Sequence, residues 1–260
     1  MSIRELYHPE SGRMRIAGFM SGSGSNLRKI IEREEEMEEK EWRSPYHVAV
    51  IFSDSPASNA ENIGREFGIP VVVRDIAAFY RERGKPIKDL AVRAEFDKNT
   101  VETLSSFDID VMAYAGYMRI ATPPLINAFL GVNVHPADLS IMEGDKRRYT
   151  GDHAVRDAIL AGEKQLRSTT HIIEDRVDYG RILMISQALH VILPSGLDLE
   201  DKAQVKAVSD EHQNRLKEVG DWEIFPKTLE YIADGRYLQD ENGDLYFDNS
   251  QMPNGLKLEE

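Results

Sequence analysis

The sequence predicts a Rossmann-like α/β fold, a doubly wound and mostly parallel sheet with helices on both faces. Short apolar runs typical of fully buried strands alternate with stretches of helical length. A glycine-rich turn directly follows the first apolar run, which is typical of a strand–turn–helix unit. The 260 residues suffice for one large domain, and no linker, repeat or low-complexity segment divides them.

Charge and composition exclude several classes of protein. The formal net charge of −13 lacks the basic footprint of a nucleic-acid binder, and no apolar run reaches membrane-spanning length. There is no cysteine and no signal-peptide pattern, so disulfides and thiolate–metal sites are not expected. We therefore expect a cytoplasmic monomer or homodimer that binds small molecules. Seven glutamates between positions 32 and 41 are interpreted as a solvated helix face.

The first strand is expected at 14–20, and a helix follows from about Leu27. Between them lie Gly22, Ser23, Gly24, Ser25 and Asn26. Two glycines allow backbone N–H groups to turn inward, and the helix start adds a partial positive charge, so the loop can hold a phosphate. The pattern completes neither a Walker A loop nor a full G-x-G-x-x-G motif, and a plain tight turn explains it equally well.

The remaining elements follow an alternating rhythm. Strands are expected at 47–53, 70–73, 109–115, 128–135, 168–173 and 181–191, with a turn at 174–180 that makes the last two hairpin-like. Helices are expected at 59–67, 96–104, 123–129, 153–161, 200–217 and 225–234, with a loop or broken helix at 79–93. An Asn242-Gly243 turn predicts a C-terminal hairpin. We divide the chain into an irregular leader (1–13), one domain (14–235) and a C-terminal extension (236–260).

Two polar side chains stand out in the motif Asn-Val-His-Pro at 133–136. Side chains alternate along a strand, so Asn133 and His135 project to the same face, and Pro136 is expected to end the strand. The carboxyl ends of strands are where open α/β sheets bind ligands. A turn with two local hydrogen bonds is the alternative.

Two neighbouring features have less specific patterns. The long loop 137–151 contains Lys146, Arg147 and Arg148, which fits either a solvated loop or one that faces a substrate. His171 lies on an apolar strand and is interpreted as a hydrogen-bonded structural histidine.

Four motifs together resemble the folate-dependent formyltransferases, most closely the branch that formylates glycinamide ribonucleotide in purine synthesis. They are the glycine-rich loop with Leu27, Ala-Gly-Tyr-Met-Arg-Ile at 115–120, Asn-Val-His-Pro at 133–136 and Asp-Tyr-Gly at 178–180. The resemblance covers about residues 14–235. It implies transfer of formyl from 10-formyltetrahydrofolate, as co-substrate, to an amine, with no metal and no covalent enzyme intermediate.

The resemblance implies a role for three residues in particular. The side-chain amide of Asn133 would stabilise the oxyanion, an effect worth about 3 kcal/mol in comparable sites. His135 would shuttle protons or stabilise the oxyanion when protonated, and Asp178 would hold His135 or a relay water and favour the charged imidazole.

Further residues would bind the two substrates. Those expected at the phosphate and ribose of the acceptor are Gly22, Ser23, Gly24, Ser25, Asn26, Arg93 and Glu211. Those expected at the folate are Met118, Arg119, Ile120, Glu174, Asp175 and Val177.

The sequence also departs from the family pattern, and the departures concern the acceptor. The loop after Pro136 is longer than usual, Tyr179 replaces the first glycine of Asp-Gly-Gly, and extra helical sequence follows Glu211. Another phosphorylated or sugar amine is therefore an alternative acceptor. Hydrolysis of formyltetrahydrofolate, formylation of tRNA and a non-catalytic binding homologue are less consistent with this sequence.

Overall fold

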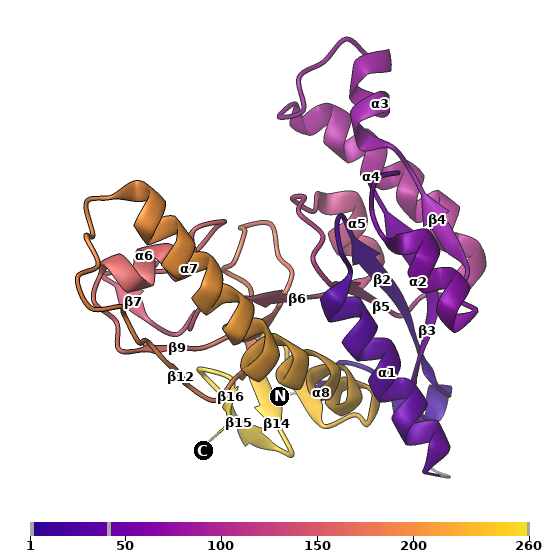
Figure 1. The fold of residues 1–260 in the computed structure, drawn as a ribbon. Helices are drawn as coiled ribbons and strands as arrows, with labels where there is room; N and C mark the ends of the chain where they lie inside the picture. Colours follow the sequence, from indigo (N-terminus) through magenta and orange to yellow (C-terminus); the bar gives the residue numbers. More distant parts are fainter. Residues whose placement is uncertain (1–2, 41–42, 259–260) are drawn as a thin grey trace.

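The computed structural model describes residues 3–40 and 43–258 and has an α/β architecture in three layers (Figure 1). An eight-stranded sheet forms the middle layer in the order β16-β11-β10-β6-β5-β2-β3-β4. Every neighbouring pair in it is parallel except the two pairs that β10 makes with β6 and β11. The predicted fold class is confirmed. Its strands are β2 (Met14–Met20), β3 (Tyr46–Ser53), β4 (Val71–Val73), β5 (Val111–Tyr114), β6 (Leu130–His135), β10 (Thr169–Ile172), β11 (Ile182–Ile185) and β16 (Leu256–Lys257).

The strand order reverses direction beside β2. The chain runs from β2 outward through β3 to β4, and then returns to place β5 on the other side of β2. After β2 and after β5 the chain therefore continues in opposite directions across the sheet. Doubly wound sheets form a ligand crevice at such a point. Two hydrogen bonds join the loops that follow β2 and β5, from Ser21 N to the Gly116 carbonyl and from Met118 N to Ser21 Oγ, both 3.1 Å long.

Alternating apolar side chains of the strands create two cores, one on each sheet face. Ile16 packs with the first core, and its neighbour Ala17 with the second. The helices that contribute to the first core are α1 (Ser25–Glu39), α2 (Ala60–Phe67) and α8 (Trp222–Ala233). Those of the second core are α3 (Ile76–Glu82), α4 (Leu90–Leu104) and α5 (Pro123–Ala128). The segment 79–93 is thus a broken helix, interrupted between α3 and α4.

A third cluster lies beside the sheet and includes α6 (Ala154–Leu160) and α7 (Lys202–Leu216). These helices form the part of the molecule at the left in Figure 1, where α7 leads toward α8. A π-helical turn, η3 (Lys217–Asp221), connects α7 to α8. Shorter elements are η1 (Pro9–Ser11), η2 (Ser105–Phe107), β7 (Met142–Glu143), β8 (Lys146–Arg147), β9 (Gln165–Leu166) and β12 (Leu189–His190).

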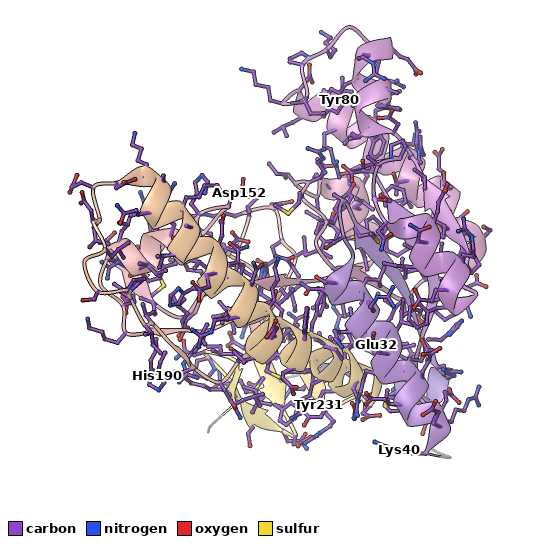
Figure 2. The ribbon with its side chains drawn as sticks, viewed as in Figure 1. Glu32, Lys40, Tyr80, Asp152, His190 and Tyr231 are labelled. Atoms are coloured by element: carbon purple, nitrogen blue, oxygen red, sulfur yellow. The ribbon has the colours of Figure 1, made fainter. Side chains whose placement is uncertain are left out.

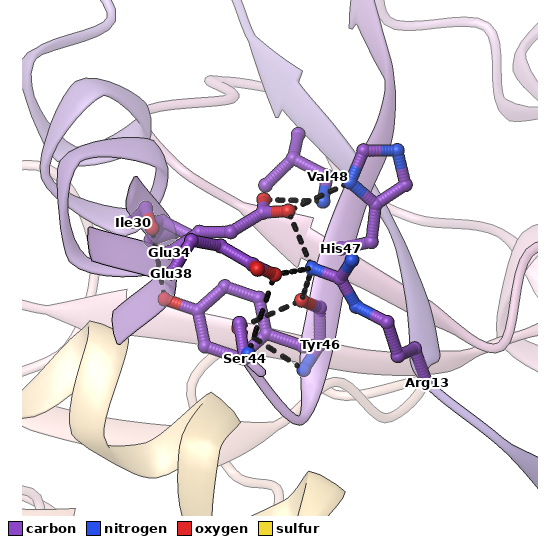
Figure 3. A network of polar contacts seen from close by, with 8 residues as sticks. All are labelled: Arg13, Ile30, Glu34, Glu38, Ser44, Tyr46, His47 and Val48. Atoms are coloured by element: carbon purple, nitrogen blue, oxygen red, sulfur yellow. Dashed lines mark hydrogen bonds and ion pairs between the residues drawn. The ribbon is translucent and has the colours of Figure 1, made fainter. Parts of the chain in front are cut away.

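The glutamate-rich helix α1 is not solvated throughout. Glu34 is only 8% exposed and accepts a hydrogen bond from Val48 N at 2.9 Å, while its other oxygen contacts Arg13 and His47 (Figure 3). The expectation of a solvated face was wrong for Glu34, because it pairs with β3 and the chain before β2. Other glutamates of the run are exposed or half-buried along the helix, which ends before Lys40 (Figure 2). Glu41 lies outside the described residues.

The first strand of the chain pairs with a strand of the C-terminal extension. Strand β1 (Ile3–Glu5) lies beside β13 (Tyr237–Asp240), which continues through β14 (Leu245–Phe247) to β15 (Ser250–Gln251) in a four-stranded sheet. The predicted hairpin at Asn242-Gly243 is present. The leader is not irregular, because β1 gains its hydrogen-bond partners from the distant β13. The division of the chain into three parts remains a prediction.

Candidate functional site

The candidate site lies at the carboxyl ends of three adjacent parallel strands. Phe19 of β2, Tyr114 of β5 and Asn133 of β6 are in register across the sheet. Neighbouring strands lie about 4.8 Å apart, so the ends of β2 and β6 are roughly 10 Å apart. The glycine-rich loop and the Asn133–His135 pair therefore share one edge of the sheet.

Asn133 is held by a histidine on the next strand. His171 of β10 pairs directly opposite Asn133, and the Asn133 amide nitrogen lies 3.1 Å from His171 Nε2. His171 Nδ1 is 2.8 Å from the carbonyl of Ile172, which only accepts, so Nδ1 carries the proton and Nε2 accepts from Asn133. The amide has two N–H groups, so one remains for a substrate oxygen.

His135 has a defined orientation as well. Its Nε2 lies 3.0 Å from the carbonyl of Tyr149 and must donate to it, so Nδ1 is the nitrogen that can gain a proton. That Nδ1 faces Asp178 Oδ2 at 3.6 Å. Burial lowers the pKa of His135, and this effect outweighs the opposing influence of Asp178. Asp178 does favour the charged imidazole, as expected, but the net result is a neutral His135 near pH 7.

Asp178 lies between the two histidines. Its Oδ1 is 3.6 Å from His171 Nε2, and its Oδ2 accepts a 2.8 Å hydrogen bond from Gly151 N in addition to facing His135. Burial by itself raises the pKa of Asp178, but the Gly151 N–H, together with His171 and His135 in their protonated forms, lowers it to about 2. The carboxylate is therefore ionised at neutral pH and can stabilise a proton on His135.

The backbone around Asp178 explains the Asp-Tyr-Gly pattern. Asp178 has a φ of 58°, a left-handed conformation that aspartate tolerates better than most residues. A Cβ atom at Gly180 would lie 1.7 Å from the Ile172 carbonyl oxygen, so only glycine fits there. No such steric limit applies at Tyr179. The guanidinium carbon of Arg176 lies 3.3 Å from the centre of the Tyr179 ring.

The interpretation of His171 as only structural missed its part in the site. It is hydrogen-bonded, as expected, but its partner is the candidate catalytic amide. Antiparallel pairing of 168–173 with the strand of Asn133 would have indicated this, because directly opposite residues in such a pair project to the same face. The sequence pattern predicts the strand at 168–173 but not the strand with which it pairs.

The glycine-rich loop has the geometry of an anion site. Gly24 precedes α1 with a φ of 73°, and no side chain caps the helix start. The loop is tied to the start of α2, because Asn59 N donates to the Gly22 carbonyl at 3.0 Å. The first N–H groups of α1 have no acceptor within the helix and lie at its partially positive end.

Asp221, not Glu211, reaches this loop. The Asn26 amide donates to Asp221 Oδ2 at 3.2 Å, and Ser168 Oγ donates to Oδ1 at 2.5 Å. Burial raises the pKa of Asp221, although both donors counter it. Glu211 is exposed on α7, ten residues earlier, which is roughly 15 Å of helix rise. The long α7 thus separates Glu211 from the residue that contacts the loop, and a role for Glu211 at the acceptor stays a prediction.

Arg93 is not a cation beside the loop either. It is 3% exposed on α4, where Nη2 lies 2.8 Å from Asp97 Oδ1 and 3.0 Å from the Tyr117 hydroxyl. α4 covers the second core, whereas the loop leads into α1 on the opposite face of the sheet. Its charge is therefore satisfied internally by Asp97.

The segments expected at the folate are loops with accessible side chains. Met118 is 64% exposed and Ile120 50%, and between them Arg119 Nε lies 2.6 Å from Asp54 Oδ2. In the second segment Val177 and Asp175 are exposed. Glu174 pairs with Arg181 at 2.7 Å across the turn. Apolar side chains that remain exposed beside a polar centre are suited to a flat aromatic ligand.

Within residues 3–40 and 43–258, no group of three or more histidine, aspartate or glutamate side chains is placed to hold a metal ion. No helix there has the length and apolarity needed to cross a membrane.

Comparison with known proteins identifies relatives of this chain. The profile of the family described as formyl transferase matches residues 14–215. The chain is 25% identical over 242 residues to phosphoribosylglycinamide formyltransferase of Escherichia coli, covering 92% of this chain and 96% of that protein. It is 28% identical over 228 residues to the trifunctional purine biosynthetic protein adenosine-3 of Drosophila melanogaster, covering 87% of this chain but spanning only 14% of that protein.

Solved structures share the fold. Glycinamide ribonucleotide transformylase 1 from Symbiobacterium toebii superposes with a TM-score of 0.66 at 26% identity, covering 90% of this chain and 94% of that one. Phosphoribosylglycinamide formyltransferase from Coxiella burnetii gives a TM-score of 0.70 at 18% identity, covering 95% and 100%. At that identity the second likeness concerns the fold alone.

Proposed function

The chain belongs to the formyl transferase family, and we propose that it transfers formyl from 10-formyltetrahydrofolate to the amine of glycinamide ribonucleotide in purine biosynthesis. The observation that supports this most directly is the linked group in which His135 and His171 both face Asp178 and His171 holds the amide of Asn133. The group lies at the same sheet edge as an anion-binding loop.

Each group has a chemical task in this reaction. The acceptor amine attacks the formyl carbon, and the carbonyl oxygen becomes an oxyanion. The free N–H of the Asn133 amide donates to that oxyanion, and His171 keeps the amide turned toward it. The donor is oriented before the reaction, so no reorganisation opposes the transition state.

Protons then move from the attacking nitrogen to the departing folate nitrogen. His135 is neutral near pH 7 because burial lowers its pKa, so Nδ1 can accept the proton. Asp178 faces that nitrogen with a full negative charge and stabilises the imidazolium until the proton is returned. The proton balance closes without a group outside this set.

The substrates are proposed to bind on either side of this centre. The acceptor phosphate binds Gly22, Ser23, Gly24, Ser25 and Asn26 at the start of α1. The folate lies along 118–120 and the 174–177 turn, where Met118, Ile120 and Val177 are exposed. Asp221 holds the loop through Asn26.

The test is an assay of purified protein with 10-formyltetrahydrofolate and glycinamide ribonucleotide, following both the formylated product and tetrahydrofolate. We expect equal amounts of both, and none without the acceptor. Tetrahydrofolate without a formylated product would instead indicate hydrolysis. Because the loop 137–151 is longer than the family pattern, other phosphorylated and sugar amines belong in the same assay. Transfer to one of them but not to glycinamide ribonucleotide would overturn the proposed acceptor.

A further inference from the structure

The long loop after Pro136 folds back onto the catalytic centre. Its strands β7 and β8 form a small hairpin, and the chain leaving β8 contacts both His135 and Asp178. Arg147 Nη1 donates to the Asp178 carbonyl at 2.6 Å, Tyr149 accepts from His135, and Gly151 N donates to the Asp178 carboxylate. Residues 147–151 therefore hold Asp178 at two points, its main chain and its side chain.

The contact between Arg147 and the Asp178 segment is reciprocal. The Arg147 side chain binds the carbonyl of Asp178, and the Arg147 backbone N–H donates to the Tyr179 hydroxyl at 3.1 Å. The Tyr179 ring lies near two cations, with its centre 3.3 Å from the Arg176 guanidinium carbon and 5.6 Å from that of Arg147. Arg147 is half-buried, and burial lowers its pKa.

We propose that Arg147 is a positioning residue, which fixes the left-handed backbone of Asp178 so that the carboxylate faces His135 and His171 together. The φ of 58° at Asp178 is an unfavourable backbone conformation for a residue with a side chain. A charge-assisted hydrogen bond to the adjoining carbonyl is strong enough to offset that cost. The inference rests on the proposed function only for its kinetic consequence.

Titration of His135 separates positioning from a simple charge effect. The groups that face His135 are Asp178 from the turn before β11, His171 from β10 and Arg147 from β8, with the Tyr149 carbonyl on Nε2. Asp178 raises the pKa of His135 and Arg147 lowers it, the influence of Asp178 being the larger. If Arg147→Met displaces the Asp178 carboxylate, the pKa of His135 falls. If Asp178 stays in place, removal of the Arg147 cation raises the pKa of His135.

The experiment compares Arg147→Met and Arg147→Lys with the wild-type protein. Arg147→Met should lower kcat at least about tenfold while both KM values change less than about threefold, because positioning acts on the reaction step. The pKa of His135, followed by NMR, should fall. Arg147→Lys should restore kcat to within about threefold of wild type, since an ammonium group can donate to the same carbonyl.

Lys146→Met is the matched control. It removes one positive charge from the same hairpin at an exposed side chain, and it should leave both kcat and the His135 titration unchanged. Tyr179→Phe removes the hydroxyl that accepts from Arg147 and keeps the ring. It should lower kcat and the His135 pKa in the same direction by a smaller amount, and it decides the matter if Arg147→Met does not fold.

Two results would overturn the inference. One is a raised acceptor KM at unchanged kcat, which would make Arg147 a substrate-binding residue. The other is a raised pKa of His135 in Arg147→Met. If the wild-type protein transfers formyl to none of the amines, the proposed function fails, and the NMR titration still decides the role of Arg147.

Discussion

Replacement of Asp178 by asparagine separates the structural and the catalytic demands on this site. Asparagine has nearly the same shape and also tolerates the left-handed backbone. It can still accept a hydrogen bond from Gly151 N. It lacks the negative charge that faces His135 at 3.6 Å and His171 at 3.6 Å. The variant therefore removes the electrostatic contribution and leaves the packing.

The expected loss of stability follows from the pKa of Asp178. The ordinary value is 3.8, and in the folded protein it is about 2, because the two histidines and the Gly151 N–H outweigh the opposing effect of burial. At about 1.4 kcal/mol per pH unit, this difference corresponds to at most about 2 kcal/mol of folding stability at pH 7, because the histidine contribution requires protonated imidazoles. A lowered carboxyl pKa stabilises the fold fully above pH 3.8. That contribution is lost as the pH falls through about 2.

Urea unfolding of both proteins between pH 7 and the onset of acid unfolding measures this. Asp178→Asn should be less stable than wild type at pH 7 by up to about 2 kcal/mol, and the difference should narrow below pH 4. The kcat for formyl transfer should fall by up to about 10²–10⁴-fold, the range for general acid–base catalysis, because proton transfer by His135 depends on the charge of Asp178. Asp152→Asn, an exposed residue next to Gly151 (Figure 2), is the control and should match wild type. Equal stability of Asp178→Asn and wild type at pH 7 would refute this account.

Three more results are expected. Gly180→Ala should lower the free energy of unfolding by at least about 3 kcal/mol in thermal or urea unfolding, because its Cβ would lie 1.7 Å from the Ile172 carbonyl oxygen. Glu34→Ala should lower the free energy of unfolding by about 2 kcal/mol, since it removes the acceptor that lies 2.9 Å from the buried backbone N–H of Val48. In a kcat profile from pH 5 to 9, activity should rise with pH through a pKa below 6.5 and then level off, because His135 must be neutral to accept a proton.

Gly22 and Glu35 provide matched control positions for the variants at Gly180 and Glu34. A Cβ on Gly22 meets no heavy atom within 4 Å, and Glu35 is exposed on the same helix as Glu34. Gly22→Ala and Glu35→Ala should therefore change stability by less than about 0.5 kcal/mol. A stable Gly180→Ala, or equal costs at the two glutamates, would contradict the packing described. Activity that declines from pH 5 to 7 would indicate that His135 works in its protonated form.

Much of the fold follows from local patterns in the sequence. Runs such as 14–20 are buried on both faces and so are apolar throughout, which distinguishes central strands from the helices between them. The positions of Gly22 and Gly24 place a tight turn before α1, and Gly24 does adopt a positive φ. Alternation along β6 puts Asn133 and His135 on one face. These inferences need only neighbours within a few residues of each other.

Contacts between distant segments required the tertiary structure. His171 lies 38 residues from Asn133 in the chain and Asp221 lies 195 from Asn26, yet each pair is hydrogen-bonded. Glu34 belongs to a glutamate run that predicts exposure, and only its position against β3 makes it buried.

The sequence by itself therefore determined the order of strands and helices, the glycine turn and the shared face of Asn133 and His135. The tertiary structure alone shows that His171 and Asp178 lie together beside His135, that Arg93 is buried against Asp97, and that Glu211 is exposed on α7. The physical reason is that periodicity and turn chemistry act over a few residues. Burial and charge pairing depend on which distant segments the packed sheet and helices bring together.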